Sequence, residues 1–154
     1  MVFRLALLAA LLTSCAAPAR PPQAAPPSDF SLSLTIVGDS PAAPDLEPAW
    51  YVLEPDGLLR AALGQRQAVS PIPPVVRRLT ETQFREVWDA TRESGALEAP
   101  VGGVQVADSV LPRQGAAVSV SADGVRRTRV YEGPPDRFAA LSSLLRRLAW
   151  VSGA

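Results

Sequence analysis

The stretch FSLSLTIVG, residues 30–38, decides the fold because its apolar and polar side chains alternate without a break. Its apolar members are Phe30, Leu32, Leu34 and Ile36, and its hydroxyl members are Ser31, Ser33 and Thr35. Successive side chains of a β-strand point to opposite faces, so this period of two predicts a strand with one buried face. The serines are then surface residues and not nucleophiles.

Two Asp-Gly pairs further along the chain predict β-hairpins. Asp56-Gly57 lies inside AWYVLEPDGLLRAAL, residues 49–63, and Asp123-Gly124 lies inside AAVSVSADGVRRTRVYEG, residues 116–133. Asp-Gly is favoured in such turns because glycine readily adopts the positive φ that they require. The flanking apolar segments are therefore expected to be paired antiparallel strands.

Two segments carry the pattern of amphipathic helices. In RLTETQFREVWDATRESGAL, residues 78–97, Thr80 and Gln83 have the spacing of a capping box, and Gly95 is placed to end the helix. The second segment, PPDRFAALSSLLRRLAWV, residues 134–151, has a Leu-rich face and begins with prolines. We expect Trp150 to close the core at the end of this helix.

The order of these elements is strand, hairpin, helix, hairpin, helix. It predicts an α+β fold, with an antiparallel sheet of about five or six strands and two helices packed on one face. Residues 64–78 contain three prolines and predict a loop, with a short edge strand as an alternative. Residues 101–106 are a further candidate strand, followed by a loop that reaches residue 115.

The start of the chain has the composition of a secretory signal. Arg4 precedes an uninterrupted run of Leu and Ala from Leu5 to Leu12, which is too short for a membrane-spanning helix of about 20 residues. Leu12, Thr13, Ser14 and Cys15 then resemble the lipobox of bacterial lipoproteins. The resemblance implies cleavage between Ser14 and Cys15, and attachment of diacylglycerol and a further acyl chain to Cys15.

A proline-rich segment follows the single cysteine of the sequence. Residues 16–28, AAPARPPQAAPPS, would reach on the order of 40 Å as extended polyproline II. We therefore expect three parts: a signal peptide at 1–14, a lipidated tether at 15–28 and a single α+β domain at 29–154. Position 16 is Ala and not Asp, so the resemblance implies the periplasmic face of the outer membrane in a two-membrane organism.

The composition limits the available chemistry. All fifteen basic residues are Arg, and Lys, His and Asn are absent. Imidazole bases, Schiff-base lysines and His-ligated metals are therefore excluded, and we expect no metal and no cofactor. The charges balance without a dense basic stripe, which argues against nucleic acid as a partner. Gly102-Gly103 lacks the strand, turn and helix context of a phosphate-binding loop.

The return strand of the second hairpin carries the best candidate binding residues. Alternation places Arg127, Arg129 and Tyr131 on one face, where the two arginines could contact an anionic group. A simpler interpretation is that these arginines protect an exposed strand from pairing with another sheet edge.

From about residue 79 to 150, a helix, an Asp-Gly hairpin and a Leu-rich last helix follow one another. This layout is similar to that of the emfourin-type inhibitors of bacterial metalloproteases, although the proline-rich insertions depart from it. We therefore expect a noncatalytic, lipid-anchored envelope protein that binds another envelope protein, with protease inhibition as one specific form. The alternatives are an assembly lipoprotein that docks to a larger complex, and a small enzyme using Asp108 and Glu98.

Overall fold

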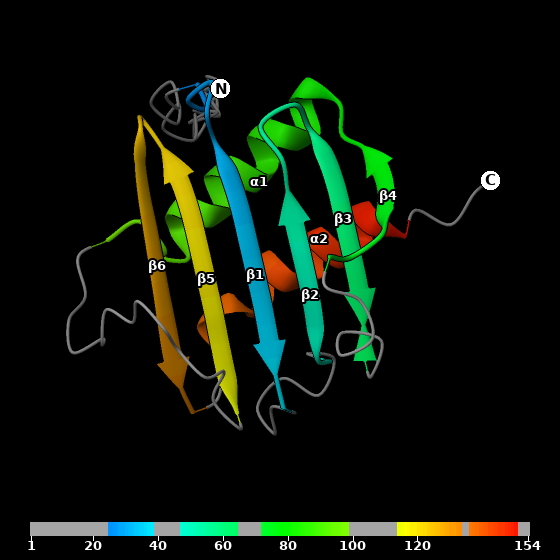
Figure 1. Ribbon diagram of the computed structural model, residues 1–154, viewed down its shortest axis with the longest axis vertical. Coiled ribbons are helices and arrows are strands. Elements are labelled where there is room, and N and C mark those ends of the chain that lie inside the picture. The colour runs from blue at the N-terminus through cyan, green and yellow to red at the C-terminus, as the bar shows by residue number, and fades with distance from the viewer. Residues whose placement is uncertain (1–24, 39–46, 65–71, 99–113, 134–135, 151–154) are drawn as a thin grey trace, which may run out of the picture.

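The computed structural model describes residues 25–38, 47–64, 72–98, 114–133 and 136–150, which include one six-stranded antiparallel sheet (Figure 1). The strands are β1 (Ser31–Val37), β2 (Ala49–Leu53), β3 (Leu58–Leu63), β4 (Val75–Arg78), β5 (Gly115–Ala122) and β6 (Val125–Glu132). Their order across the sheet is β4-β3-β2-β1-β5-β6. Strand β1 is therefore interior, with one hairpin on each side.

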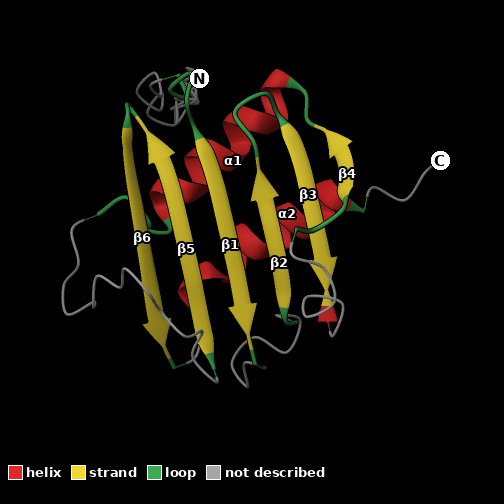
Figure 2. Ribbon diagram, in the orientation of Figure 1, coloured by secondary structure: helices red, strands yellow, loops and turns green. Residues whose placement is uncertain are grey.

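Two helices, α1 (Glu81–Glu93) and α2 (Ala139–Ala149), cover the same face of the sheet (Figure 2). A short 3-10 turn, η2 (Asp136–Phe138), leads into α2. The opposite face carries no helix among the described residues. The predicted α+β fold, with five or six strands and two helices on one face, is confirmed.

The alternation in β1 places its apolar side chains beneath the helices. Leu32, Leu34 and Ile36 are buried, and in the pairing with β2 they lie opposite Leu53, Tyr51 and Ala49. The hydroxyl residues face the uncovered side, where Trp50 Nε1 donates to Ser33 Oγ at 3.3 Å. The apolar side chains of β1 thus face the core, and its hydroxyl side chains face the uncovered side of the sheet, as their period of two predicts.

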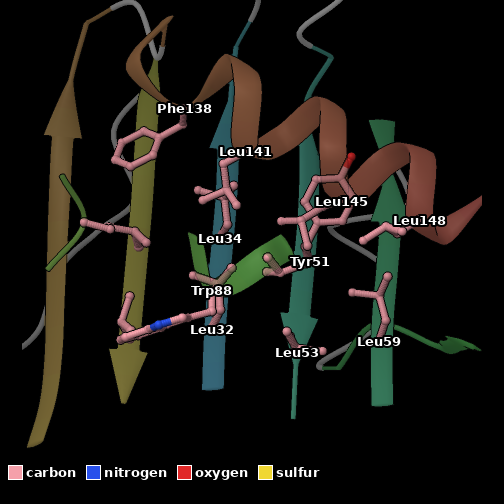
Figure 3. Close-up of a cluster of buried hydrophobic side chains, with 14 of the residues drawn as sticks. Leu32, Leu34, Tyr51, Leu53, Leu59, Trp88, Phe138, Leu141, Leu145 and Leu148 are labelled. Atoms are coloured by element: carbon pink, nitrogen blue, oxygen red, sulfur yellow. The ribbon is translucent and has the colours of Figure 1, made fainter. Parts of the chain in front are cut away.

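The core lies between the sheet and α2 (Figure 3). Side chains of three adjacent strands face the Leu-rich face of this helix, namely Leu34, Tyr51 and Leu59 against Leu141, Leu145 and Leu148. All six are at most 3% exposed. Because burial of one such side chain contributes about 1.5–3 kcal/mol, this layer is the main source of stability.

Helix α1 begins and ends where its sequence predicts. Thr80 Oγ1 accepts a hydrogen bond from the Gln83 amide at 3.3 Å, and the Gln83 side chain accepts one from the Thr80 amide at 3.0 Å. Gly95 has φ 71°, a conformation that favours glycine after a helix. The buried residues Val87, Trp88 and Thr91 confirm that α1 is amphipathic, as its sequence pattern predicts.

Three other expectations have different outcomes. A short edge strand does form within residues 64–78, as β4. The candidate strand at 101–106 lies outside the described residues. The expected burial of Trp150 is wrong, because its side chain is 45% exposed. The apolar face of α2 is already filled by leucines, and the helix ends at Ala149 before Trp150 can join it.

Candidate functional site

Strand β6 forms one edge of the sheet and is joined to β5 by a two-residue turn. Asp123 and Gly124 have φ 54° and 73°, and the register pairs Ala122 with Val125 directly across the turn. Positive φ at both turn residues is typical of the type I′ hairpin. The turn therefore fixes which backbone groups of β6 face β5 and which face outward.

The outward groups belong to alternate residues. In an antiparallel ladder hydrogen-bonded and non-hydrogen-bonded pairs alternate, starting from the hydrogen-bonded pair beside a two-residue turn. Arg127, Arg129 and Tyr131 therefore direct their amides and carbonyls toward β5. Those of Arg126, Thr128 and Val130 point away from the sheet, where no described strand pairs with them. Among the described strands, β6 is thus an eight-residue edge whose outward amides and carbonyls are unpaired.

The structure places Arg127, Arg129 and Tyr131 on one face of β6, and that face is the helix-covered one. They lie opposite Val120, Val118 and Ala116 of β5, which have their side chains in the core. The sequence alternation groups these three residues but does not identify the face. A strand with arginines on both faces gives no apolar signal for the side that is buried.

Arg129 is the most unusual residue of this edge because it is only 7% exposed. Among the described residues its guanidinium has no hydrogen-bond acceptor and no carboxylate within ion-pair distance. Arginine is seldom this buried without a partner, because removal of the charge from water is costly. The β6 edge therefore contains a cation that lacks a counter-charge in the described part of the chain.

Tyr131 is held by packing at the far end of β6. Its ring meets Phe138 edge-on at 5.0 Å between centroids, and the Arg137 guanidinium lies 4.9 Å from the Tyr131 ring. Arg137 also donates to the Ser94 carbonyl at 3.3 Å, just beyond the end of α1. This cluster joins β6 to η2 and to the end of α1.

At the turn end of β6, Asp29 accepts two backbone hydrogen bonds. Its carboxylate receives the Asp123 amide at 2.9 Å and the Gly124 amide at 2.6 Å. The Gly124 amide is the main cause that lowers the pKa of Asp29 below its ordinary value of 3.8. Sequence reasoning missed this contact, because no local pattern relates residues that lie more than ninety positions apart.

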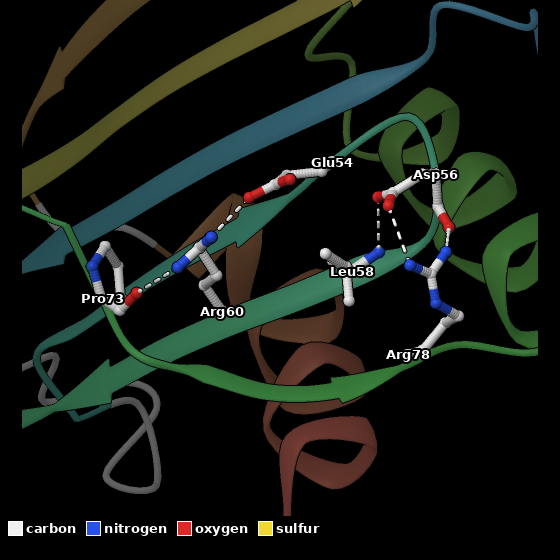
Figure 4. Close-up of polar contacts among 6 residues, drawn as sticks. All are labelled: Glu54, Asp56, Leu58, Arg60, Pro73 and Arg78. Atoms are coloured by element: carbon white, nitrogen blue, oxygen red, sulfur yellow. Dashed lines mark hydrogen bonds and ion pairs between the residues drawn. The ribbon is translucent and has the colours of Figure 1, made fainter.

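The opposite edge, β4, has arginines that do have partners, and Figure 4 shows the contacts of one of them, Arg78. Arg77 donates to the Leu148 carbonyl at 3.1 Å, and Arg78 pairs with the Asp56 carboxylate at 3.0 Å and also donates to the Asp56 carbonyl. The Leu58 amide, and after it Arg78, lower the pKa of Asp56. Beside them, Arg60 Nε lies 2.5 Å from Glu54 Oε1.

A small hollow between β2 and α2 is the other candidate site. It is lined by Glu47, Tyr51, Leu63, Ser142, Ser143 and Arg146, and Arg146 lies 3.6 Å from Glu47. Burial raises the pKa of Tyr51, while the Ser142 side chain opposes this shift. The empty volume is about 190 Å³ with open solvent included, below the roughly 300 Å³ at which ligand pockets begin. The hollow fits water or a small ion better than an organic substrate.

The remaining candidates from the sequence are not assembled into a site by the described residues. Glu98 is exposed at the end of the turn after α1, and its proposed partner Asp108 lies outside the described residues. Cys15, the rest of the lipobox and Gly102-Gly103 also lie outside them. Within the described ranges, no cluster of three or more metal-ligating residues occurs, and no helix is long and apolar enough to cross a membrane.

Comparison with known proteins adds no assignment to these surfaces. No protein-family model matches the chain, and no curated protein is similar to it in sequence.

Proposed function

We propose that this protein is a lipid-anchored component of the bacterial cell envelope, whose tethered α+β domain binds another envelope protein through the β6 edge. The observation that carries the proposal is the eight-residue edge strand, with its outward amides and carbonyls unpaired among the described residues. Such an edge is a ready template for another chain, and proteins usually cover or shorten it. The anchor itself rests on the lipobox at Leu12 to Cys15.

The geometry at Asp29 is consistent with this arrangement. The tether would reach the domain at Ser28, and the next residue is bonded to the β5–β6 turn. Strand β6 then runs away from the point of attachment (Figure 1). A partner could therefore approach most of the edge without displacing the tether.

Anchoring is tested by replacement of the lipidated cysteine. Cys15→Ser should release the protein from membranes and abolish labelling with a radioactive fatty acid. Ser28→Ala, outside the lipobox, is a control that leaves the thiol and the cleavage site in place. Lipid labelling of the Cys15→Ser protein would refute the anchor.

Binding is tested by site-specific photocrosslinking in the native envelope. A photoreactive residue at Thr128, on the β6 edge, should capture one defined protein, whereas the same residue at Val75, on β4, should not. Both positions are exposed strand positions at sheet edges, so Val75 is a matched control. Equal capture at both positions, or no capture at Thr128, would refute a specific β6 interface.

The identity of the captured protein separates the versions of this function. A metalloprotease would support the inhibitor form that the emfourin-type layout suggests, and the purified domain should then slow that protease. A subunit of a larger envelope complex would support the assembly form. Neither form requires the domain to catalyse a reaction.

A further inference from the structure

We propose that the partner of the β6 edge is an extended acidic segment, which adds antiparallel to β6 as a seventh strand and places a carboxylate against Arg129. This inference rests on the proposed function, because it names the chemistry of the chain that the β6 edge binds. Its two supports are the direction of the backbone groups and the charge of the helix-covered face of β6.

The backbone groups favour an antiparallel addition. The outward amides and carbonyls of Arg126, Thr128 and Val130 would form the hydrogen-bonded pairs with the new strand. Arg127 and Arg129 would then stand in non-hydrogen-bonded pairs, in which facing Cα atoms approach to about 4.5 Å and side chains come closest. Antiparallel addition thus places the residues opposite Arg127 and Arg129 where an ion pair forms most readily.

The charges determine the side chains of the bound segment. Successive residues of a strand alternate between faces, so the residues opposite Arg127 and Arg129 are two positions apart. An Asp or Glu at each of them would supply the counter-charge that Arg129 lacks among the described residues. A charge-assisted hydrogen bond is about twice as strong as a neutral one, and Arg129 is the least exposed arginine of β6, which makes it the centre of selectivity.

A second copy of the chain fits the same edge poorly. The antiparallel registers that pair most of two β6 strands place Arg127 opposite Arg129, or either residue opposite itself. Like charges directly opposite each other destabilise a strand pair. Charge complementarity therefore favours an acidic segment over self-association.

The inference is tested by binding of two labelled ten-residue peptides to the full mature chain carrying Cys15→Ser. One peptide, TVTVEVEVTV, has Glu at alternate positions, and the control TVTVQVQVTV has Gln there. Fluorescence anisotropy should show at least tenfold tighter binding of the Glu peptide. Arg129→Met should remove most of this preference. Arg85→Gln, which removes a positive charge from the exposed surface of α1, should change it less than twofold.

A proline at Thr128 tests the backbone part of the inference. The Thr128 amide points outward, so Thr128→Pro removes a hydrogen bond to the added strand without removing a backbone hydrogen bond to β5. It also removes the hydrogen bond between the Thr128 and Ser119 hydroxyls, and Thr128→Val, which removes this bond alone, is the control. Thr128→Pro should weaken binding of the Glu peptide at least tenfold, while circular dichroism remains that of the parent protein. Should this variant misfold, an N-methylated amide at one outward position of the Glu peptide tests the same bond from the other side.

The outcomes separate this inference from the proposed function. Equal binding of the two peptides, binding of neither, or an unchanged affinity with Thr128→Pro would overturn the acidic seventh strand. Capture at Thr128 in the envelope would still support a β6 interface in that case. A dimer in sedimentation equilibrium that Thr128→Pro dissociates would identify a second copy as the occupant and overturn the inference as well.

Discussion

Strand β4 at one edge of the sheet has four residues, whereas β6 at the other edge has eight. The arginines of the two strands also differ in their hydrogen-bond partners. Arg77 and Arg78 of β4 donate to the end of α2 and to the β2–β3 turn. On β6, Arg126 donates only to the Ser119 hydroxyl, at 3.0 Å, and Arg129 has no partner among the described residues.

The difference shows that the two edges of one sheet can differ in their capacity to bind another strand. Strand β4 is short, its arginines are already bonded, and an added strand would gain little from them. Strand β6 is long and regular, and its Arg129 is only 7% exposed and has no counter-charge among the described residues. An inward-pointing charge also blunts an edge as long as no partner neutralises that charge. A carboxylate from an added strand would remove this obstacle, so Arg129 favours an acidic strand over other strands.

The largest expected effect concerns the packing that holds β6 onto the helices. Phe138 is fully buried and meets Tyr131 at the end of β6, so Phe138→Ala should lower the free energy of unfolding by roughly 3–5 kcal/mol. Urea denaturation measures this loss. Hydrogen exchange should show that the Arg129 amide loses more protection than the amides of β3 paired with β4. Equal loss at both edges would mean that Phe138 supports the whole core and not β6.

The second prediction compares the same substitution at the two edges. Arg77→Met removes a charge-assisted hydrogen bond to the last turn of α2 and should lower the free energy of unfolding by about 1.5 kcal/mol. Arg129→Met replaces a charge that has no partner in the described part of the chain with an apolar side chain of similar length, and should raise the free energy of unfolding by about 1 kcal/mol.

Opposite signs in urea denaturation would confirm that only the β4 arginine is held by a partner. Arg78→Met is the surface control, and its effect should stay below about 1 kcal/mol because its ion pair is exposed. Destabilisation by Arg129→Met would show that this guanidinium is already paired, and would also remove one support of the acidic-strand inference.

The sequence predicts most of the fold on which this comparison of edges rests, but it does not predict that Arg129 faces the helices. The alternation of residues 30–36, the two Asp-Gly turns and the Thr80 capping box are local signals, and the fold that they predict is the observed one. Residues 127, 129 and 131 are correctly grouped on one face by alternation. That this face lies beneath the helices follows from the pairing of Arg129 with Val118, which only the assembled sheet determines.

The wrong expectation for Trp150 and the failure to predict the Asp29 contact have the same physical origin. Trp150 is apolar enough to be expected in the core, but its burial depends on the space that the leucines of α2 leave. The contact of Asp29 with the β5–β6 turn joins the segment before β1 to the turn after β5, and no spacing rule predicts it. Local patterns determine elements and their faces, whereas the state of an edge depends on contacts between distant segments.

The smallest expected effect is a loss of stability at acidic pH that differs between the two edges. Asp29 holds the β5–β6 turn and Asp56 holds β4 through Arg78, and both carboxyls have pKa values lowered below 3.8 in the folded protein. A lowered folded pKa means that the unfolded chain binds protons more readily. Each carboxylate therefore stabilises the fold above about pH 4, and this stabilisation is lost as the pH falls through the folded pKa.

Asp29→Asn and Asp56→Asn should each flatten the decline of the melting temperature between pH 5 and pH 2, while lowering the melting temperature slightly at pH 7. Hydrogen exchange assigns each loss to its edge, because Asp29→Asn should expose the Gly124 amide and Asp56→Asn the Leu58 amide. Glu81→Gln is a suitable control, since its carboxylate only joins a surface pair with Arg85 within α1. If Asp29→Asn left the acid decline unchanged, the turn of β6 would be held by the hairpin alone. The β6 edge would then be independent of the segment that carries the tether.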